Sequence, residues 1–210
     1  MKIWTITLLL LSCFVPFGFA QGVPDMQRDV MRSEGAWEVS LQGGGIFPHK
    51  TDRFDDTEFA AGRITYDLSQ NVAFGIESGW LRFQDEIGGT KYGRIDGMPA
   101  LAEVQLKLPV QSTGNRFVPY AIAGAGVVVW NYRESSILRD AGAKVETDTH
   151  FAAKGGMGFD YYINSTLAIF LEGSYLFSRF APKVHGGGTT VTTKADTGAV
   201  LAGGGLKVRF

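Results

Sequence analysis

The chain has 210 residues, of which 28 are glycine, 12% are aromatic and 20% are charged. This length fits one domain of ordinary size, and the charged share is below the roughly 25% of typical soluble proteins. A formal net charge of -1 excludes the strongly basic character of a nucleic-acid-binding protein, so no nucleic-acid partner is expected.

Residues 1–20 have the pattern of a cleaved signal peptide. Lys2 gives a positive start, an apolar stretch follows, and Gly18-Phe19-Ala20 forms a small-x-small cleavage site. Cleavage after Ala20 leaves Gln21 as the first mature residue. A lipoprotein signal with a lipidated Cys13 is the alternative, although the apolar run continues past that residue. Because Cys13 is the only cysteine, the mature chain is expected to contain neither disulfides nor thiolate metal sites.

Residues 21–34 are polar and are interpreted as a periplasmic N-terminal lead-in. From residue 35 to residue 210 the dominant pattern is the alternation of apolar and polar residues, which is typical of β-strands. Between Ala100 and Leu108, for example, the even positions are apolar and Glu103, Gln105 and Lys107 lie on the other face. Eight such segments are predicted, at residues 36–47, 58–67, 72–83, 98–108, 117–132, 150–162, 167–177 and 196–210.

Each segment has about the ten residues that a tilted strand needs to cross a bilayer. The connections at 68–71 and 163–166 are short and contain turn-forming residues, and 109–116 is intermediate in length. The connections at 48–57, 84–97, 133–149 and 178–195 are long. Short periplasmic turns and long external loops are typical of outer-membrane barrels. The fold predicted is therefore all-β, an eight-stranded antiparallel up-and-down transmembrane β-barrel in the bacterial outer membrane.

The aromatic residues on the apolar parity gather near both strand ends, as two membrane-interface belts would require. The periplasmic belt is predicted to contain Trp37, Tyr66, Phe74, Tyr120, Tyr161 and Phe210, and the external belt Trp80, Trp130, Tyr132, Tyr175 and Phe177. A soluble barrel with its apolar face inside is the alternative, but it gives no reason for aromatic residues at both mouths.

The polar parity is predicted to line the lumen. It has five acidic and five basic residues, namely Glu38, Arg63, Glu77, Glu103, Lys107, Lys154, Asp160, Glu172, Lys207 and Arg209. Eight strands enclose an interior that side chains can just fill, and charges confined there are costly unless they are paired. Two hypotheses remain open: a plugged, salt-bridged interior, and a narrow polar or gated pore.

Several motifs resemble the OmpW and OmpA-like small barrel families. They are the run from Met98-Pro99 to Leu108-Pro109, the segment FVPYAIAGAG at 117–126, and GGMGFDYYI at 155–163. The terminal LKVRF at 206–210 resembles the C-terminal signature that the barrel-assembly machinery reads, through Phe210. The resemblance covers about residues 35–210. With OmpW, it implies a narrow channel for small hydrophobic compounds.

Enzymatic and metal-dependent functions have little support in the sequence. A lipid A-modifying enzyme would need a histidine beside a serine, but His150 has no such partner in sequence and shares the parity of Lys154. The acidic residues Asp52, Asp55, Asp56 and Glu58 lack the spacing of a calcium loop. We therefore expect no catalytic residues, cofactor or metal site.

The expected partners are outer-membrane lipid, lipopolysaccharide and the barrel-assembly machinery, and the protein is expected to be a monomer. A structural or surface-interaction role through the external loops is the first hypothesis for its function. A narrow channel for small solutes is the alternative, and a lipid A-modifying enzyme is a third.

Overall fold

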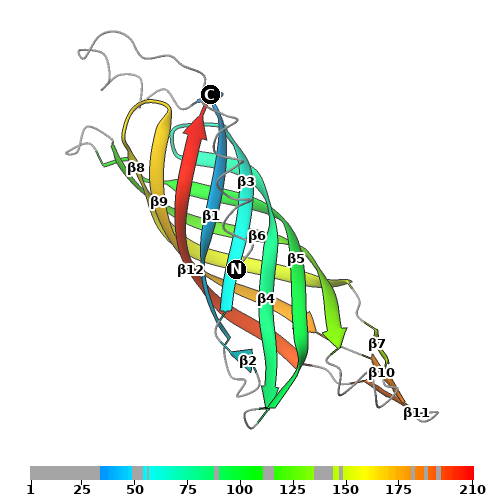
Figure 1. Ribbon diagram of the computed structural model, residues 1–210. Coiled ribbons are helices and arrows are strands. Elements are labelled where there is room, and N and C mark those ends of the chain that lie inside the picture. Colours follow the sequence, from blue (N-terminus) through cyan, green and yellow to red (C-terminus); the bar gives the residue numbers. More distant parts are fainter. Residues whose placement is uncertain are drawn as a thin grey trace.

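The computed structural model describes residues 34–48, 54–55, 57–87, 90–110, 116–134, 144–146, 149–180, 183–186, 189–192 and 195–210. All the regular elements in these ranges are β-strands (Figure 1). None of the described residues belongs to a helix long and apolar enough to span a membrane. The predicted signal peptide at 1–20, including Ala20 and Gln21, and nearly all of the lead-in at 21–34 lie outside the described residues.

Eight long strands form a closed antiparallel ring. They are β1 (Trp37–Pro48), β3 (Thr57–Asp67), β4 (Val72–Ile87), β5 (Thr90–Lys107), β6 (Phe117–Glu134), β8 (Thr149–Tyr162), β9 (Leu167–Phe180) and β12 (Ala195–Arg209). Each pairs with its neighbour along the chain, β12 also pairs with β1, and the β4–β5 pairing completes the ring. The predicted eight-stranded up-and-down barrel is confirmed.

The ring closes where the first and last strands meet. Leu41 lies opposite Leu206 in the register between β1 and β12. At its end, the Trp37 amide donates to the Phe210 carbonyl over 3.3 Å, and the Phe210 amide donates to the Trp37 carbonyl over 2.8 Å. The aromatic last residue is thus held beside the first residue of the first strand.

The end of the barrel that holds the C-terminus also holds the short turns. In the turn between β8 and β9, the Asn164 side-chain oxygen accepts bonds from the amides of Thr166 and Leu167, over 2.9 and 2.7 Å. In the turn between β3 and β4, the Ser69 hydroxyl accepts a bond of 3.1 Å from the Val72 amide. These local bonds satisfy backbone groups that strand pairing leaves unpaired, which is why such short connections suffice.

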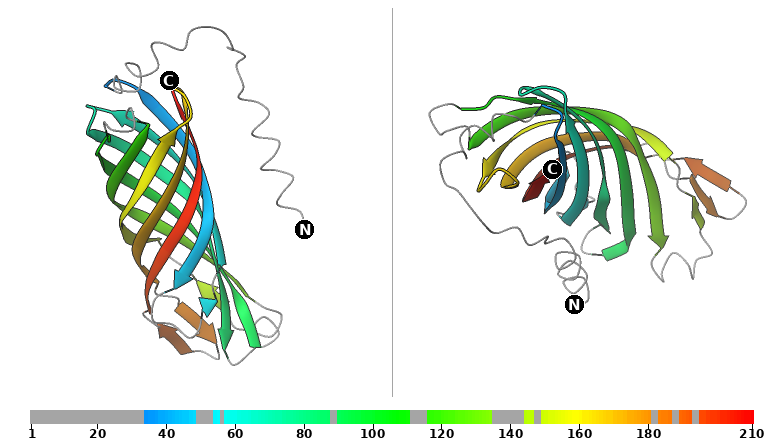
Figure 2. Two further views of the ribbon diagram at one scale, coloured as in Figure 1. Left: turned by 90° about the vertical axis from the view of Figure 1, so that its left-hand side faces the viewer. Right: turned by 90° about the horizontal axis from the view of Figure 1, so that it is seen from above.

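The opposite end carries short additional strands (Figures 1 and 2). β2 (Phe54–Asp55) pairs with β4, and β10 (Lys183–Gly186) lies between β7 (Lys144–Glu146) and β11 (Thr189–Thr192) in a separate sheet. We call this the external end, because the long connections meet there.

One predicted loop is wrong. The segment 84–97 is largely strand, since β4 continues to Ile87 and β5 begins at Thr90. Among its described side chains, Ile95 is buried with the interior residues, whereas Gln84 and Arg94 are half-buried on the outer face. The outward positions become polar where the strands leave the apolar band, and this loss of apolar character gave the appearance of a loop in the sequence.

Candidate functional site

The outer surface of the barrel is apolar. Among its side chains, Leu41, Ile76, Leu106, Met157 and Leu171 are all more than half exposed. Sequence neighbours such as Ser40, Gln105 and Glu172 are buried, because alternate residues of a strand point to opposite faces. An apolar exterior around a charged interior is the inverse of a water-soluble barrel, and it is the arrangement that a barrel needs in lipid.

All ten residues predicted to line the lumen are buried, with exposed fractions of 9% or less. They are Glu38, Arg63, Glu77, Glu103, Lys107, Lys154, Asp160, Glu172, Lys207 and Arg209. They form two ionic networks at different heights along the barrel. We call them the lower network, near the C-terminal end, and the middle network.

The lower network is organised around Glu38. Its Oε2 lies 2.8 Å from the Lys107 ammonium, and its Oε1 accepts bonds from Arg209 Nη2 and Tyr162 Oη, both over 2.8 Å. Lys107 also lies 2.6 Å from Asp67. Lys107, Arg209 and Tyr162 thus contact Glu38 directly, and Asp67 joins the network through Lys107. These four side chains come from four different strands.

Lys207 and Asp160 complete the lower network, with Nζ and Oδ2 at 2.6 Å. The same ammonium is 3.5 Å from Glu38 Oε2 and 5.3 Å from the centre of the Tyr120 ring. The network then has three bases and three acids, counting Asp67.

The middle network is organised around Arg63. Its Nη2, Nε and Nη1 lie 2.5, 2.7 and 2.9 Å from Glu77, Glu103 and Glu172. Lys154 contacts the same three carboxylates, at 2.8, 3.3 and 2.9 Å. The three acids come from β4, β5 and β9, so these contacts cross the interior and tie opposite walls together.

Several members of these networks were missed in the sequence. Asp67 is fully buried but was placed at a strand end, and it adds a sixth acid to the predicted five. Gln42 donates to Glu77 over 2.9 Å, and Tyr162 is a buried partner of Glu38. Each has the inward parity of its strand, which is the signal that could have identified it.

The prediction for Tyr120 is wrong. It was assigned to the periplasmic aromatic belt, but it is 3% exposed and its hydroxyl donates to Glu172 over 3.0 Å. Along β6, both faces are apolar: Val118, Tyr120 and Ile122 face inward, while small residues such as Ala121 face outward. Parity alone therefore could not show which face carried the belt.

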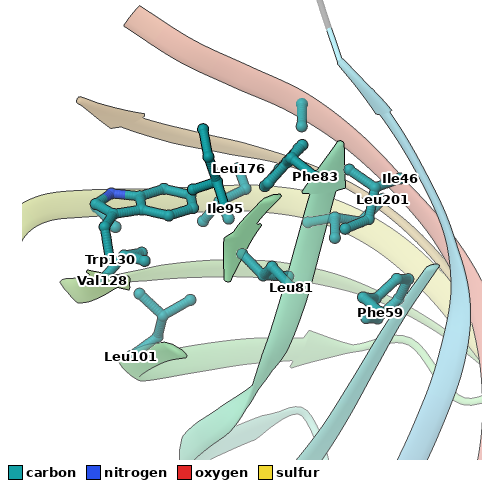
Figure 3. Packing of buried hydrophobic residues seen from close by; sticks show 12 residues of the cluster. Ile46, Phe59, Leu81, Phe83, Ile95, Leu101, Val128, Trp130, Leu176 and Leu201 are labelled. Atoms are coloured by element: carbon teal, nitrogen blue, oxygen red, sulfur yellow. The ribbon is translucent and has the colours of Figure 1, made fainter. Parts of the chain in front are cut away.

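An apolar cluster fills the barrel beyond the middle network (Figure 3). Its large members are Ile46, Phe59, Leu81, Phe83, Ile95, Leu101, Val128, Trp130, Leu176 and Leu201. Figure 3 shows their side chains pointing toward one another from strands on different sides of the barrel. The external half of the interior is therefore apolar, a feature that the assignment of the polar parity to the lumen did not include.

Trp130 is the second wrong assignment to an aromatic belt. It is 3% exposed, and its ring centre lies 5.8 Å from that of Phe83 inside the cluster. Aromatic rings at this spacing gain packing energy beyond their buried area. The prediction failed for the same reason as at Tyr120, because Trp130 shares the inward parity of β6.

A small cavity lies where the apolar cluster meets the middle network. Its volume is about 10 Å³, and its lining includes Glu77 and Lys154 on one side and Leu81, Leu101 and Leu201 on another. This is roughly the space needed for one water molecule.

The other predicted belt residues fall into three groups. Trp37, Phe74, Tyr161, Tyr175 and Phe210 are exposed, whereas Tyr66, Trp80 and Phe177 are half-buried. The side chain of Tyr132 lies outside the described residues.

Three of these rings make defined contacts. The rings of Trp37 and Tyr66 contact each other with their centres 5.0 Å apart at the C-terminal end. At the external end, the guanidinium of Arg82 lies 3.9 Å from the centre of the Trp80 ring.

Of the three histidines considered for catalysis, only His150 has a described side chain. His150 is half-buried on β8, His49 lies outside the described residues, and the side chain of His185 on β10 is not described. No group of three potential metal ligands occurs among the residues that the structure describes.

The fold is similar to that of several solved outer-membrane proteins. It matches OprG from Pseudomonas aeruginosa with a TM-score of 0.66 and 16% identity, over 84% of this chain and 96% of that one. Neisserial surface protein A matches with 0.57 and 14%, over 84% and 100%. Outer membrane protein W from E. coli matches with 0.53 and 17%, over 86% and 100%. No family model and no curated protein matches the sequence.

Proposed function

We propose that this chain, a small eight-stranded outer-membrane β-barrel, is a closed barrel that acts through its external surface rather than through its lumen. The single observation that carries the proposal is the filled interior. A solute moving along the axis would meet the lower network, the middle network and then the apolar cluster.

These layers resist passage for different reasons. An ion would have to displace paired charges in the two networks and would then lose its hydration shell among apolar side chains. An apolar solute could enter the cluster but would then have to cross buried ion pairs. Neither kind of solute has a continuous favourable path through the described interior.

The external end offers the working surface. β4 and β5 continue well past the apolar band, and β2, β7, β10 and β11 add further strands there. Loops and extensions on a rigid barrel are the usual place for binding functions. This supports a structural or surface-interaction role.

Solute release from liposomes tests the closed barrel. Liposomes containing the refolded protein are expected to retain a small dye as well as protein-free liposomes do, while an open porin in the same lipid releases it. Release that rises with the amount of folded protein would contradict the proposal.

A narrow channel for small apolar solutes is the second candidate, and the apolar cluster in the external half is the observation that favours it. The cavity beside Leu201 gives this candidate a specific test. Under the channel hypothesis, Leu201→Trp should slow the uptake of an apolar dye into vesicles. Under the closed-barrel proposal, uptake is the same with and without folded protein.

The proposal also includes three features that are expected from the sequence. Residues 1–20 are a signal peptide cleaved after Ala20, and the mature chain is a monomer that begins with the lead-in at 21–34. Phe210 is the residue through which the barrel-assembly machinery recognises the chain. N-terminal sequencing of the membrane-inserted protein should give Gln21 as its first residue, and Phe210→Ala should lower insertion in cells but not refolding in detergent.

A further inference from the structure

A group of charged side chains lies on the outer wall of β4 and β5, directly beyond the apolar band. Along the outward face of β5, Leu106, Ala102 and Met98 are exposed, and the next outward residue is Asp96, whose side chain is itself buried. Along β4, Trp80 is followed on the same face by Arg82. The change from apolar to charged residues therefore occurs at one height on both strands.

The outward direction of these residues follows from their neighbours. Leu81 and Phe83 belong to the interior cluster, so Arg82 between them faces outward. Ile95 belongs to the same cluster, which places Arg94 and Asp96 on the outer wall as well.

One carboxylate holds the two arginines together. Asp96 Oδ2 lies 3.1 Å from Arg94 Nη2, and Asp96 Oδ1 lies 3.6 Å from Arg82 Nε. Two guanidinium groups carry ten N–H donors, whereas one carboxylate accepts about four hydrogen bonds. The arginine side chains retain 23% and 35% of their exposure, so donors remain directed to the surroundings.

We propose that Arg82 and Arg94 bind a phosphate group of a lipid in the external leaflet, with Trp80 as the floor of the site. The proposal rests on the membrane placement given under Proposed function and names a lipid contact of that barrel. The ligand class is a phosphorylated glycolipid headgroup, whose phosphate oxygens match the planar fork of arginine.

The position beside Trp80 favours a lipid phosphate over a free anion. The Arg82 guanidinium lies 3.9 Å from the centre of the Trp80 ring, and Trp80 stands at the edge of the apolar band. Tryptophan marks the level where acyl chains give way to headgroups. A lipid bound here would keep its acyl chains against Met98 and the outer wall while its phosphate reached the arginines.

Acidic residues nearby set the strength of the site. Asp96 lowers the local positive charge but also fixes both guanidinium groups in position. Glu58, near the start of the neighbouring strand β3, is exposed. Glu58→Gln is therefore expected to strengthen phosphate binding, because it removes a competing negative charge without touching the arginines.

The test is a binding isotherm of the refolded full chain with fluorescent diphosphorylated lipid A in zwitterionic detergent micelles. The double variant Arg82→Gln/Arg94→Gln should bind on the order of tenfold more weakly or worse, because charge-assisted hydrogen bonds to phosphate are lost. The matched control is Arg116→Gln, an exposed arginine at the C-terminal end, which should stay within about twofold of the parent.

Two further ligands identify the source of the phosphate. Fully dephosphorylated lipid A should bind the parent as weakly as the double variant binds lipid A. Inorganic phosphate should not compete at concentrations where lipid A saturates the site. Effective competition would mean a free-anion site and would overturn the lipid proposal, as would equal affinity of parent and double variant.

If the glutamine variant does not refold, a variant that keeps both positive charges still tests the site. Arg82→Lys/Arg94→Lys keeps both charges but not the planar forks, so it should still bind more weakly than the parent. Unchanged affinity would refute the site. These experiments use lipid A in micelles, so their failure is distinct from a failure of the closed-barrel proposal, which is measured as solute release.

Discussion

Replacing Arg63 by methionine tests whether the middle network holds the barrel together. Arg63 contacts Glu77, Glu103 and Glu172 at 2.5–2.9 Å and is 3% exposed. Methionine fills similar space but leaves three buried carboxylates to one base, Lys154. Removing one partner of a buried ion pair costs about 3–5 kcal/mol, and we expect a loss of at least that size in the free energy of unfolding.

The measurement is urea unfolding of the refolded protein in lipid vesicles, followed by tryptophan fluorescence and by the gel shift between unheated and heated samples. The double variant Arg63→Met/Glu103→Gln should recover part of the loss, with a coupling energy of about 1–3 kcal/mol, because it removes one uncompensated charge. The control Arg116→Met, at an exposed position, should cost about 0.5 kcal/mol or less. A loss below about 1 kcal/mol for Arg63→Met, with no coupling to Glu103, would refute this role of the network.

Three substitutions measured in the same assay probe individual contacts. Tyr120→Phe removes the hydroxyl that donates to Glu172 over 3.0 Å and should cost about 1–2 kcal/mol. Trp130→Ala opens the apolar cluster and should cost about 3–5 kcal/mol. Gly158→Ala places a methyl group 2.5 Å from the Leu171 carbonyl oxygen and 2.6 Å from the Tyr120 hydroxyl and should cost about 1–3 kcal/mol, whereas Gly155→Ala, with nothing within 4 Å, should be nearly neutral.

Each of these has an outcome that contradicts the structure. A neutral Trp130→Ala would place the indole on the lipid-facing wall. Equal costs for Gly158→Ala and Gly155→Ala would mean that Gly158 is not packed against the Leu171 carbonyl and the Tyr120 ring. A stabilising Tyr120→Phe would mean that the hydroxyl is buried without its partner.

The strand pattern made much of the fold predictable from the sequence. The segment at 72–83 is recognisable because Phe74 and Trp80 share the apolar parity and Glu77 lies on the other, and β4 does begin at Val72. The short turns were recognisable because Ser69 and Asn164 have side chains that bond the local backbone. Both signals are local, so they can be read without knowing which strands are neighbours.

The interior was only partly predictable. The charged residues could be assigned to the lumen because a charge facing lipid is strongly unfavourable. No such penalty separates the two faces where both are apolar, as along β6, so Tyr120 and Trp130 were placed on the wrong wall. The pairing of Arg63 with acids on three strands depends on barrel shear and register, which a single sequence does not reveal.

Single-channel recording of the refolded protein in a planar bilayer tests the closed interior most directly. The filled lumen predicts a membrane resistance equal to that of the protein-free bilayer, with no steps, under conditions where gel migration shows that the barrel is folded. Trp130→Ala, measured alongside, should also stay closed, because both ionic networks remain below the opened cluster. Reproducible steps from the unmodified protein, with a conductance that scales with salt concentration, would contradict the account.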